Sequence, residues 1–200
     1  MSEQISPTPP ARRRRGCTFW LWVVFGTVLA LLLTPLVIGT FLPGEYHGGA
    51  TAELQQTPQA VWTAIADFER HPLSASRIKE VKALPSVDGM PTWLEETRSS
   101  TITVTTVEST EPNALVRRTT DSTTPMESEW RFEIEPTGGG SRVRILQDLS
   151  LGGDSWNLSY FRFTFALWDE ATRGPRDYLT RLAAGFGESP DVLALDERSE

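Results

Sequence analysis

The hydrophobic positions divide the chain into one long apolar segment and a downstream region of alternating helical and strand patterns. No residue is charged from Cys17 to Leu42, where the sequence reads CTFWLWVVFGTVLALLLTPLVIGTFL. About 20 residues at roughly 1.5 Å rise cross the roughly 30 Å hydrocarbon layer of a membrane. The segment therefore predicts a transmembrane helix over residues 17–42, with Trp20 and Trp22 near one interface and a tolerated proline at Pro35.

The first part of the downstream region predicts a strand followed by a helix. Residues 50–56 have a strand pattern and lead into Thr57 and Pro58, which suit the N-cap and the first position of a helix. Apolar residues then recur at helical spacing, at Val61, Ile65 and Phe68. We expect this helix to end near Pro72, with a short helical turn over residues 73–77.

Six further segments predict antiparallel strands, over residues 78–84, 92–98, 101–109, 115–120, 127–135 and 142–151. The fifth segment alternates most clearly, because Trp130, Phe132 and Ile134 share one face and charged residues occupy the other. Turns are predicted at Asp88-Gly89 and at the three glycines that begin with Gly138. Such alternation is typical of an antiparallel meander with one face packed on a core and one face in water.

The last apolar segment, residues 156–186, fits two patterns. A strand pattern would alternate at Phe161, Phe163, Phe165 and Leu167. A helical face accounts for more of the apolar residues, at Trp156, Tyr160, Phe163, Leu167 and Ala171. We therefore predict one long helix that is broken or kinked at Gly174-Pro175.

Charge differs between the two sides of the apolar segment. Residues 1–44 hold four of the 19 basic residues, in the run Arg12–Arg15, and one of the 26 acidic residues. Residues 45–200 hold the other 15 basic and 25 acidic residues, a formal charge of −10 that argues against a nucleic-acid partner. No Lys or Arg occurs in residues 44–60. By the positive-inside rule we expect a single-pass cell-membrane protein with a cytoplasmic N-terminus and an extracytoplasmic C-terminal domain.

These patterns predict five regions: a disordered basic cytoplasmic tail, a transmembrane helix, a linker, a folded domain and an acidic flexible tail, over residues 1–16, 17–42, 43–49, 50–186 and 187–200. A cleaved signal peptide is the alternative to an anchor, but its apolar core would be about 7–15 residues long. The sole cysteine, Cys17, is either a small apolar residue at the start of the span or a lipid-modified thiol.

Few residues predict metal, cofactor or acid–base chemistry. The two histidines, His47 and His71, have no partners at metal-ligand spacing, so no metal site is predicted. His71 with Asp67 and Glu69 is either an acid–base cluster or a solvated helix end, and we favour the second interpretation. The glycines from Gly138 form a turn between strands, and no nucleotide-binding motif occurs, so no cofactor is predicted.

The order of the predicted elements, together with one local motif, resembles a known superfamily. The motif consists of Ala52-Glu53-Leu54, then Thr57-Pro58, Val61-Trp62, Ala66-Asp67-Phe68 and Pro72. It is similar to the opening of the START-like (SRPBCC) superfamily, the polyketide cyclase/dehydrase and Bet v 1 group, and the resemblance covers about residues 48–186. The resemblance implies an α+β helix-grip fold, in which a curved antiparallel sheet wraps around a long C-terminal helix. Here one transmembrane helix precedes that fold.

One stretch departs from the superfamily pattern. Residues 152–168, between the last predicted strand and the final helix, are longer and more aromatic than a minimal member needs. This stretch could form a helical lid or a surface that rests on the bilayer.

The same resemblance implies an apolar cavity between sheet and helix, since similar cavities hold lipids, sterols, polyketides or hormones. We expect membrane-tethered binding of an apolar or amphipathic small molecule, with a lipid as the leading candidate. Gln147 shares the inward parity of its strand, and a buried amide needs hydrogen-bond partners. The candidate cavity-lining residues are Trp130, Gln147, Tyr160, Phe163, Leu167, Trp168 and Tyr178.

Two other functions stay open at this point. The domain could be an envelope protein–protein interaction module without a ligand, although the sequence identifies no protein partner and no oligomeric state. It could also be a cyclase- or dehydratase-type enzyme, which needs at least two convergent titratable groups in its pocket. The sequence offers no obvious pair of this kind, so we assign no catalytic residue and rank catalysis behind binding.

Overall fold

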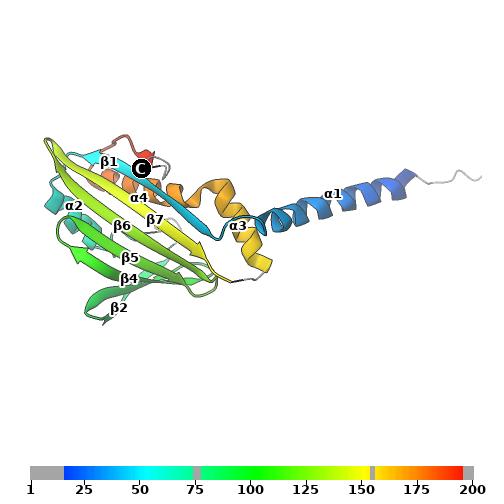
Figure 1. The fold of residues 1–200 in the computed structure, drawn as a ribbon, viewed down its shortest axis with the longest axis horizontal. Coiled ribbons are helices and arrows are strands. Elements are labelled where there is room, and N and C mark those ends of the chain that lie inside the picture. The colour runs from blue at the N-terminus through cyan, green and yellow to red at the C-terminus, as the bar shows by residue number, and fades with distance from the viewer. Residues whose placement is uncertain (1–15, 74–77, 154–155, 196–200) are drawn as a thin grey trace, which may run out of the picture.

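The computed structural model describes residues 16–73, 78–153 and 156–195. A long helix, α1 (Gly16–Gly39), projects from a body in which an eight-stranded antiparallel sheet curves around the C-terminal helices (Figure 1). Most of the predicted basic tail and of the predicted helical turn over residues 73–77 lies outside the described residues.

Among the described residues, one helix is long and apolar enough to cross a membrane. The part of α1 that meets both conditions is Phe19–Gly39. Its most apolar stretch has a mean hydropathy of 2.5 and contains no buried residue. The helix ends at Gly39 rather than at the predicted Leu42, and residues 40–42 form turns that bond back to the carbonyls of the last helical turn.

Strands that follow one another in the sequence from β2 to β7 are also neighbours in the sheet. The sheet order is β2-β3-β4-β5-β6-β7-β1-β8. The bounds are β1 (Glu45–Leu54), β2 (Glu80–Val87), β3 (Met90–Glu96), β4 (Thr101–Thr110), β5 (Ala114–Asp121), β6 (Met126–Thr137), β7 (Gly140–Leu151) and β8 (Leu193–Leu195). The antiparallel meander predicted from the alternating pattern is therefore confirmed, because each of its six segments overlaps one of these strands.

The two ends of the domain differ from the prediction. The expected linker over residues 43–49 is mostly strand, since β1 begins at Glu45, which pairs with Ser150 of β7. The tail predicted to be flexible from residue 187 contains β8, which pairs with residues 49–51 of β1. Glu188 also accepts hydrogen bonds from the Gln55 backbone and the Gln56 amide, both at 2.8 Å, and so holds the tail against the domain.

Helix α2 (Pro58–Ala66) begins as predicted but ends earlier. The Thr57 hydroxyl accepts a hydrogen bond from the Ala60 amide at 3.3 Å, and Pro58 occupies the first turn. The helix ends at Ala66, six residues before the predicted end at Pro72. The residues between them form turns, with the His71 amide bonded to the Asp67 carbonyl at 3.0 Å.

The C-terminal helix is broken at a different residue from the one predicted. It consists of α3 (Trp156–Trp168) and α4 (Glu170–Gly185), and Pro175 lies inside α4. Asp169 between them has φ 47° and ψ 54°, the left-handed conformation, which Asp adopts more readily than most residues. Figure 1 shows the result: α4 runs along the sheet, whereas α3 runs across the end of α1.

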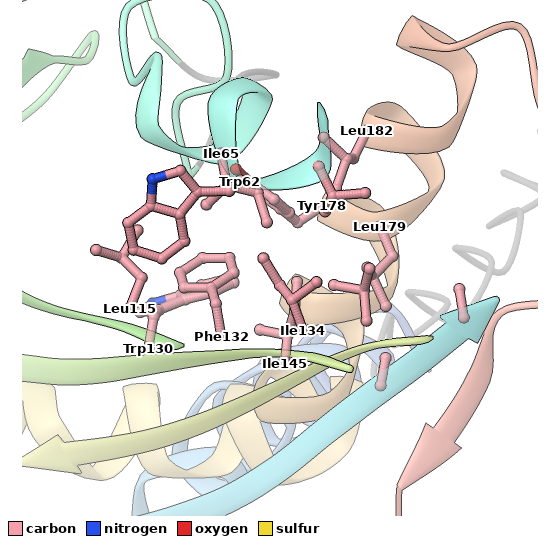
Figure 2. Packing of buried hydrophobic residues seen from close by; sticks show 14 of the residues in the cluster. Trp62, Ile65, Leu115, Trp130, Phe132, Ile134, Ile145, Tyr178, Leu179 and Leu182 are labelled. Atoms are coloured by element: carbon pink, nitrogen blue, oxygen red, sulfur yellow. The ribbon is translucent and has the colours of Figure 1, made fainter. Parts of the chain in front are cut away.

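A hydrophobic core fills the part of the domain under α2 and the second half of α4. Figure 2 shows side chains of both helices pointing toward Phe132, Ile134 and Ile145 on the sheet. The helical contributors that it labels are Trp62, Ile65, Tyr178, Leu179 and Leu182. Full burial of one such side chain contributes about 1.5–3 kcal/mol. This core fixes where the helices lie and leaves the other half of the sheet free to border a hollow.

Candidate functional site

A cavity of about 1090 Å³ lies between the sheet and the C-terminal helices. Strands β3 to β7 supply its floor, and α3 and α4 supply its wall and roof. Its larger apolar lining residues are Leu73, Ile78, Ile102, Met126, Trp130, Leu149, Phe161 and Phe165. Thr and Ser side chains add hydroxyl groups to the lining, so it is amphipathic rather than uniformly apolar. Charged residues also border the cavity, namely Lys79, Glu95, Arg98, Asp121, Glu170, Arg173, Asp177 and Arg181.

The cavity lies at the end of the sheet where α1 enters the domain. The strand register shows this, because Glu45 at the start of β1 pairs with Ser150 near the end of β7. Leu151, the next residue of β7, pairs with Met126 at the start of β6. Leu149 and Met126 both line the cavity, as do the turns over residues 97–100 and 121–124 at the same sheet end.

The floor of the cavity carries a buried amide. Gln147 donates from Nε2 to Ser128 Oγ at 3.1 Å, while its Oε1 has no hydrogen-bond partner among the described residues. Above it, a Cβ atom on Gly174 would lie 2.8 Å from Gln147 Oε1 and 3.0 Å from the Trp130 ring. Glycine at this position therefore lets α4 approach the floor closely. The helix thus covers an acceptor whose burial without a hydrogen bond costs free energy.

A buried arginine that the sequence analysis missed lies deeper, below α2. Arg117 of β5 exposes 1% of its surface, and its guanidinium stacks 4.7 Å from the Phe68 ring centroid and 5.3 Å from that of Trp93. Its Nη2 donates to the Ile65 carbonyl at 2.9 Å. That carbonyl belongs to the last turn of α2, where a cation complements the helix dipole. Burial lowers the pKa of Arg117, and the nearby Tyr178 and Glu95 oppose this effect.

Two more charged residues, which line the cavity, hold the chain in place at Pro72 and Leu73, the proline bend that follows α2. Glu95 of β3, 1% exposed, accepts a hydrogen bond from the Leu73 amide at 3.1 Å. Arg181 of α4 donates to the Pro72 carbonyl at 3.2 Å and to the Leu73 carbonyl at 2.8 Å. The bend is therefore tied to a strand and to a helix at once. Burial also lowers the pKa of Arg181.

The alternation of side chains along each strand could have identified Arg117 and Glu95 as inward-facing residues. Arg117 lies two positions from Leu115, and Glu95 lies two positions from Trp93, so each shares the inward face of its strand. The sequence analysis used this parity for Gln147 and not for the two charged residues.

The predicted lining residues fall into three groups. Trp130 and Gln147 border the cavity. Tyr178 is buried in the core instead, where its hydroxyl lies beside Arg117 without a hydrogen bond of normal geometry, and burial raises its pKa. The four on α3 do not border the cavity: Phe163 is half-buried, and the exposed ones are Tyr160, Leu167 and Trp168.

The side of α3 that faces the cavity is the one opposite the predicted stripe. Phe161 and Phe165 border the cavity, and Leu158 one turn earlier packs on Leu149 and Leu151 of the floor. Apolar residues occur on both sides of α3, so helical spacing alone selected the wrong side.

The two histidines lie apart from the cavity. The His71 ring lies against Gly185 of α4, and burial lowers its pKa, an effect that the charge of Asp67 partly offsets. His47 Nδ1 lies 2.7 Å from Asp148 Oδ1, where both side chains are largely exposed. Across residues 16–73, 78–153 and 156–195, no three His, Cys, Asp or Glu side chains gather in a metal-binding arrangement.

No protein-family model and no curated protein matches the sequence, whereas solved structures do match the fold. The Zhui aromatase/cyclase from Streptomyces sp. R1128 matches with a TM-score of 0.50 and 10% identity, over 72% of this chain and 99% of that protein. A conserved protein from Geobacillus kaustophilus matches with a TM-score of 0.52 and 11% identity, over 73% of this chain and 98% of its own.

The di-domain ARO/CYC StfQ from the steffimycin biosynthetic pathway matches with a TM-score of 0.52 and 9% identity, over 72% of this chain. The present chain spans only 52% of that protein's length. At these identities the matches concern the fold. The shared architecture is a curved antiparallel sheet closed around C-terminal helices, so the part of this chain that follows α1 has the START-like (SRPBCC) helix-grip fold.

Proposed function

We propose that this chain is a membrane-anchored protein that binds an apolar or amphipathic small molecule in the cavity between the sheet and the C-terminal helices. A lipid is the leading candidate for this ligand. The observation that carries the proposal is a hollow of about 1090 Å³ at the sheet end next to α1. This volume is slightly above the roughly 300–1,000 Å³ that is common for small-molecule pockets.

The lining fits a ligand with both apolar and polar parts. The Leu149, Phe161 and Phe165 side chains offer an apolar surface, and each methylene group that a ligand buries there contributes about 0.8 kcal/mol. The Ser and Thr hydroxyls of the lining offer hydrogen bonds to a polar group. A lipid acyl chain with an ester or hydroxyl group has this combination.

The anchor part of the proposal rests on α1 and on the charges beside it. An uncharged segment of this length suffices to cross the bilayer, and the run Arg12–Arg15 precedes it. With no Lys or Arg in residues 44–60, the positive-inside rule favours a cytoplasmic N-terminus and an extracytoplasmic domain. In that arrangement the cavity lies beside the bilayer, which is a reservoir of apolar ligands.

The same geometry favours binding over the two alternatives. A catalytic site would need titratable groups that converge on a substrate. Glu95 and Arg181 of the lining are engaged with the backbone of the proline bend, and Lys79, Arg98, Arg173 and Asp177 of the lining are exposed. An interaction module with a vestigial cavity would fill that space with its own side chains, and here the space is open.

A substitution that fills the cavity tests the binding proposal. Thr119, 7% exposed, lies on the floor, so Thr119→Trp should occupy the space of the ligand. The neighbouring Thr120 is exposed on the other face of β5, so Thr120→Trp is the matched control. The full chains are released from detergent micelles into native mass spectrometry, and the phospholipids that each chain retains are counted.

We expect the unmodified chain and Thr120→Trp to retain one phospholipid more than Thr119→Trp. Lipids bound around α1 affect all three samples equally. The melting temperature of each chain shows whether the variants are folded. Equal lipid counts in three folded samples would contradict the proposal.

A further inference from the structure

Helix α3 has an exposed apolar face that the cavity does not use. Tyr160, Leu167 and Trp168 are 50%, 62% and 61% exposed, and Arg162 is the only charged residue of the helix. Phe161 and Phe165 of the same helix line the cavity instead. A helix between a core and water normally presents polar residues outward. The outward face of α3 therefore has the composition of a surface that contacts something apolar.

The structure places α3 beside the last turns of α1. A Cβ atom on Gly39 would overlap the backbone of Ser159, so the two helices are in direct contact there. Pro35 and Leu36, one turn before Gly39, are half-buried, although the rest of the apolar helix is largely exposed. The α3 backbone at Ser159 thus lies level with Gly39, which belongs to the uncharged segment.

Three further contacts hold this arrangement where α1 joins the sheet. The Tyr46 hydroxyl donates to the Arg162 carbonyl at 2.7 Å, and the Leu151 amide donates to the Gly44 carbonyl at 2.7 Å. The Tyr46 ring also meets the Phe165 ring edge-on, with 6.2 Å between their centroids. The start of β1 therefore connects α1, α3 and the sheet, and α3 lies across the end of α1 (Figure 1).

We propose that the exposed face of α3, defined by Tyr160, Leu167 and Trp168, lies in the interface of the same lipid bilayer that α1 crosses. This inference rests on the membrane anchoring proposed above. Side chains that project from α3 at the depth of residues 35–39 meet lipid rather than water. Tyr and Trp are the side chains that membrane interfaces favour, and an interfacial helix lies in the plane of the bilayer with its apolar face in the lipid.

This placement deepens the proposed binding function. Phe161 and Phe165 face the cavity, while Leu167 and Trp168 face the lipid, so a single helix separates the two. A lipid that enters beside α3 reaches the cavity without crossing water.

Fluorescence quenching at single labelled positions tests the inference on the full chain. Cys17→Ser removes the sole cysteine, and Leu167→Cys or Ala184→Cys introduces one exposed site for the environment-sensitive fluorophore NBD. Ala184, exposed in the last turn of α4 and outside the cavity lining, is the matched control. The labelled chains are reconstituted in vesicles of phosphatidylcholine and phosphatidylglycerol. Quenching is measured with lipids that carry a nitroxide on the acyl chain, and separately with aqueous iodide.

We expect the label at position 167 to be quenched severalfold more by the nitroxide lipid than the label at position 184, and severalfold less by iodide. Equal iodide quenching at both positions overturns the inference. Protection from both quenchers at position 167 also overturns it, since that result indicates contact between protein copies.

A second variant separates this inference from the binding proposal. In a Leu167→Glu/Trp168→Glu chain labelled at Tyr160→Cys, the added charges should raise iodide quenching severalfold over the same label without them. No change in quenching overturns the inference. Native mass spectrometry of the same samples counts retained lipid, so a failure of the binding proposal appears as a missing lipid, independently of where α3 lies.

Discussion

Arg117 and Glu95 show how two buried charges serve the local structure. Each exposes 1% of its surface, on the inner faces of β5 and β3. Arg117 satisfies the Ile65 carbonyl at the end of α2, and Glu95 satisfies the Leu73 amide in the proline bend. A carbonyl that the end of α2 leaves unpaired and an amide in the bend after it thus receive charged partners, whose hydrogen bonds are worth more than neutral ones.

Replacing Arg117 by methionine should destabilise the protein. Arg117→Met removes the donor to the Ile65 carbonyl. It also removes one of the two arginine charges, Arg117 and Arg181, that interact with the buried Glu95, so the negative charge of Glu95 is less well neutralised. We expect a loss of roughly 2–3 kcal/mol, or about 5–10 °C in the melting temperature of the detergent-solubilised full chain. The adjacent, largely exposed Arg118, ion-paired with Glu129 at 3.2 Å, is the control, and Arg118→Met should change stability by less than about 1 kcal/mol.

A double variant isolates the electrostatic part of this loss. Glu95→Gln keeps an oxygen that can accept the Leu73 amide while it removes the negative charge. The double variant Arg117→Met/Glu95→Gln should therefore lose less stability than the sum of the two single variants. Strict additivity would show that the two charges do not interact.

At the scale of elements, the packing of α4 on β1 depends on glycine. A Cβ atom on Gly48 would lie 2.8 Å from the Ala171 carbonyl carbon and 2.9 Å from the Thr172 nitrogen, both backbone atoms. Backbone atoms cannot rotate away as the end of a side chain can. Gly48 therefore lets the first turn of α4 pack directly on the strand.

Gly48→Ala should destabilise the domain by roughly 1–3 kcal/mol, because α4 must move off β1 to make room for the methyl group. Gly138, in the turn between β6 and β7, has no atom within 4 Å of the Cβ position. Gly138→Ala is the control and should be close to neutral. Thermal unfolding of the two full-length variants measures the difference, and similar melting temperatures would contradict the packing argument.

The elements that local patterns specify were predictable. Period-2 alternation identified the six meander strands, and Thr57 with Pro58 identified the start of α2. The first half of β1 was missed because Gly48 and Gly49 resemble a linker, whereas the structure uses them for close contact with α4 and β7. Strand β8 was missed because its pairing with residues 49–51 is a contact between distant parts of the sequence.

The candidate site was predictable only in part. Strand parity correctly placed Gln147 and Trp130 on the cavity side of the sheet. The helical stripe through Tyr160 and Leu167 selected the exposed side of α3, because apolar residues on both sides leave helical spacing without a preferred face. The break at Asp169 was missed because a left-handed residue at that position follows from tertiary packing, while Gly174-Pro175 is the stronger local signal.

At the scale of the whole molecule, the charge distribution predicts the orientation in the membrane. A cysteine introduced by Ala184→Cys in the Cys17→Ser background should react with a membrane-impermeant maleimide on intact cells, because the proposed orientation puts the domain outside. Replacement of Arg12–Arg15 by asparagine should lower the reactive fraction severalfold. Reaction only after the cells are lysed would contradict the proposed orientation.

In the proposed membrane arrangement, the cavity lies next to a source of lipid. The hollow lies at the sheet end where α1 enters, and the packed core occupies the other half of the domain. Filling the hollow with a lipid chain would therefore leave the core contacts intact.

Photo-crosslinking from within the bilayer tests the central claim most directly. The full chain is reconstituted in vesicles that contain a phospholipid with a diazirine in its acyl chain, irradiated, and mapped by mass spectrometry. If the cavity holds a lipid chain, adducts form on Met126 and Leu149 of the sheet floor as well as on α1. Adducts confined to α1 and the outer face of α3 would contradict the account.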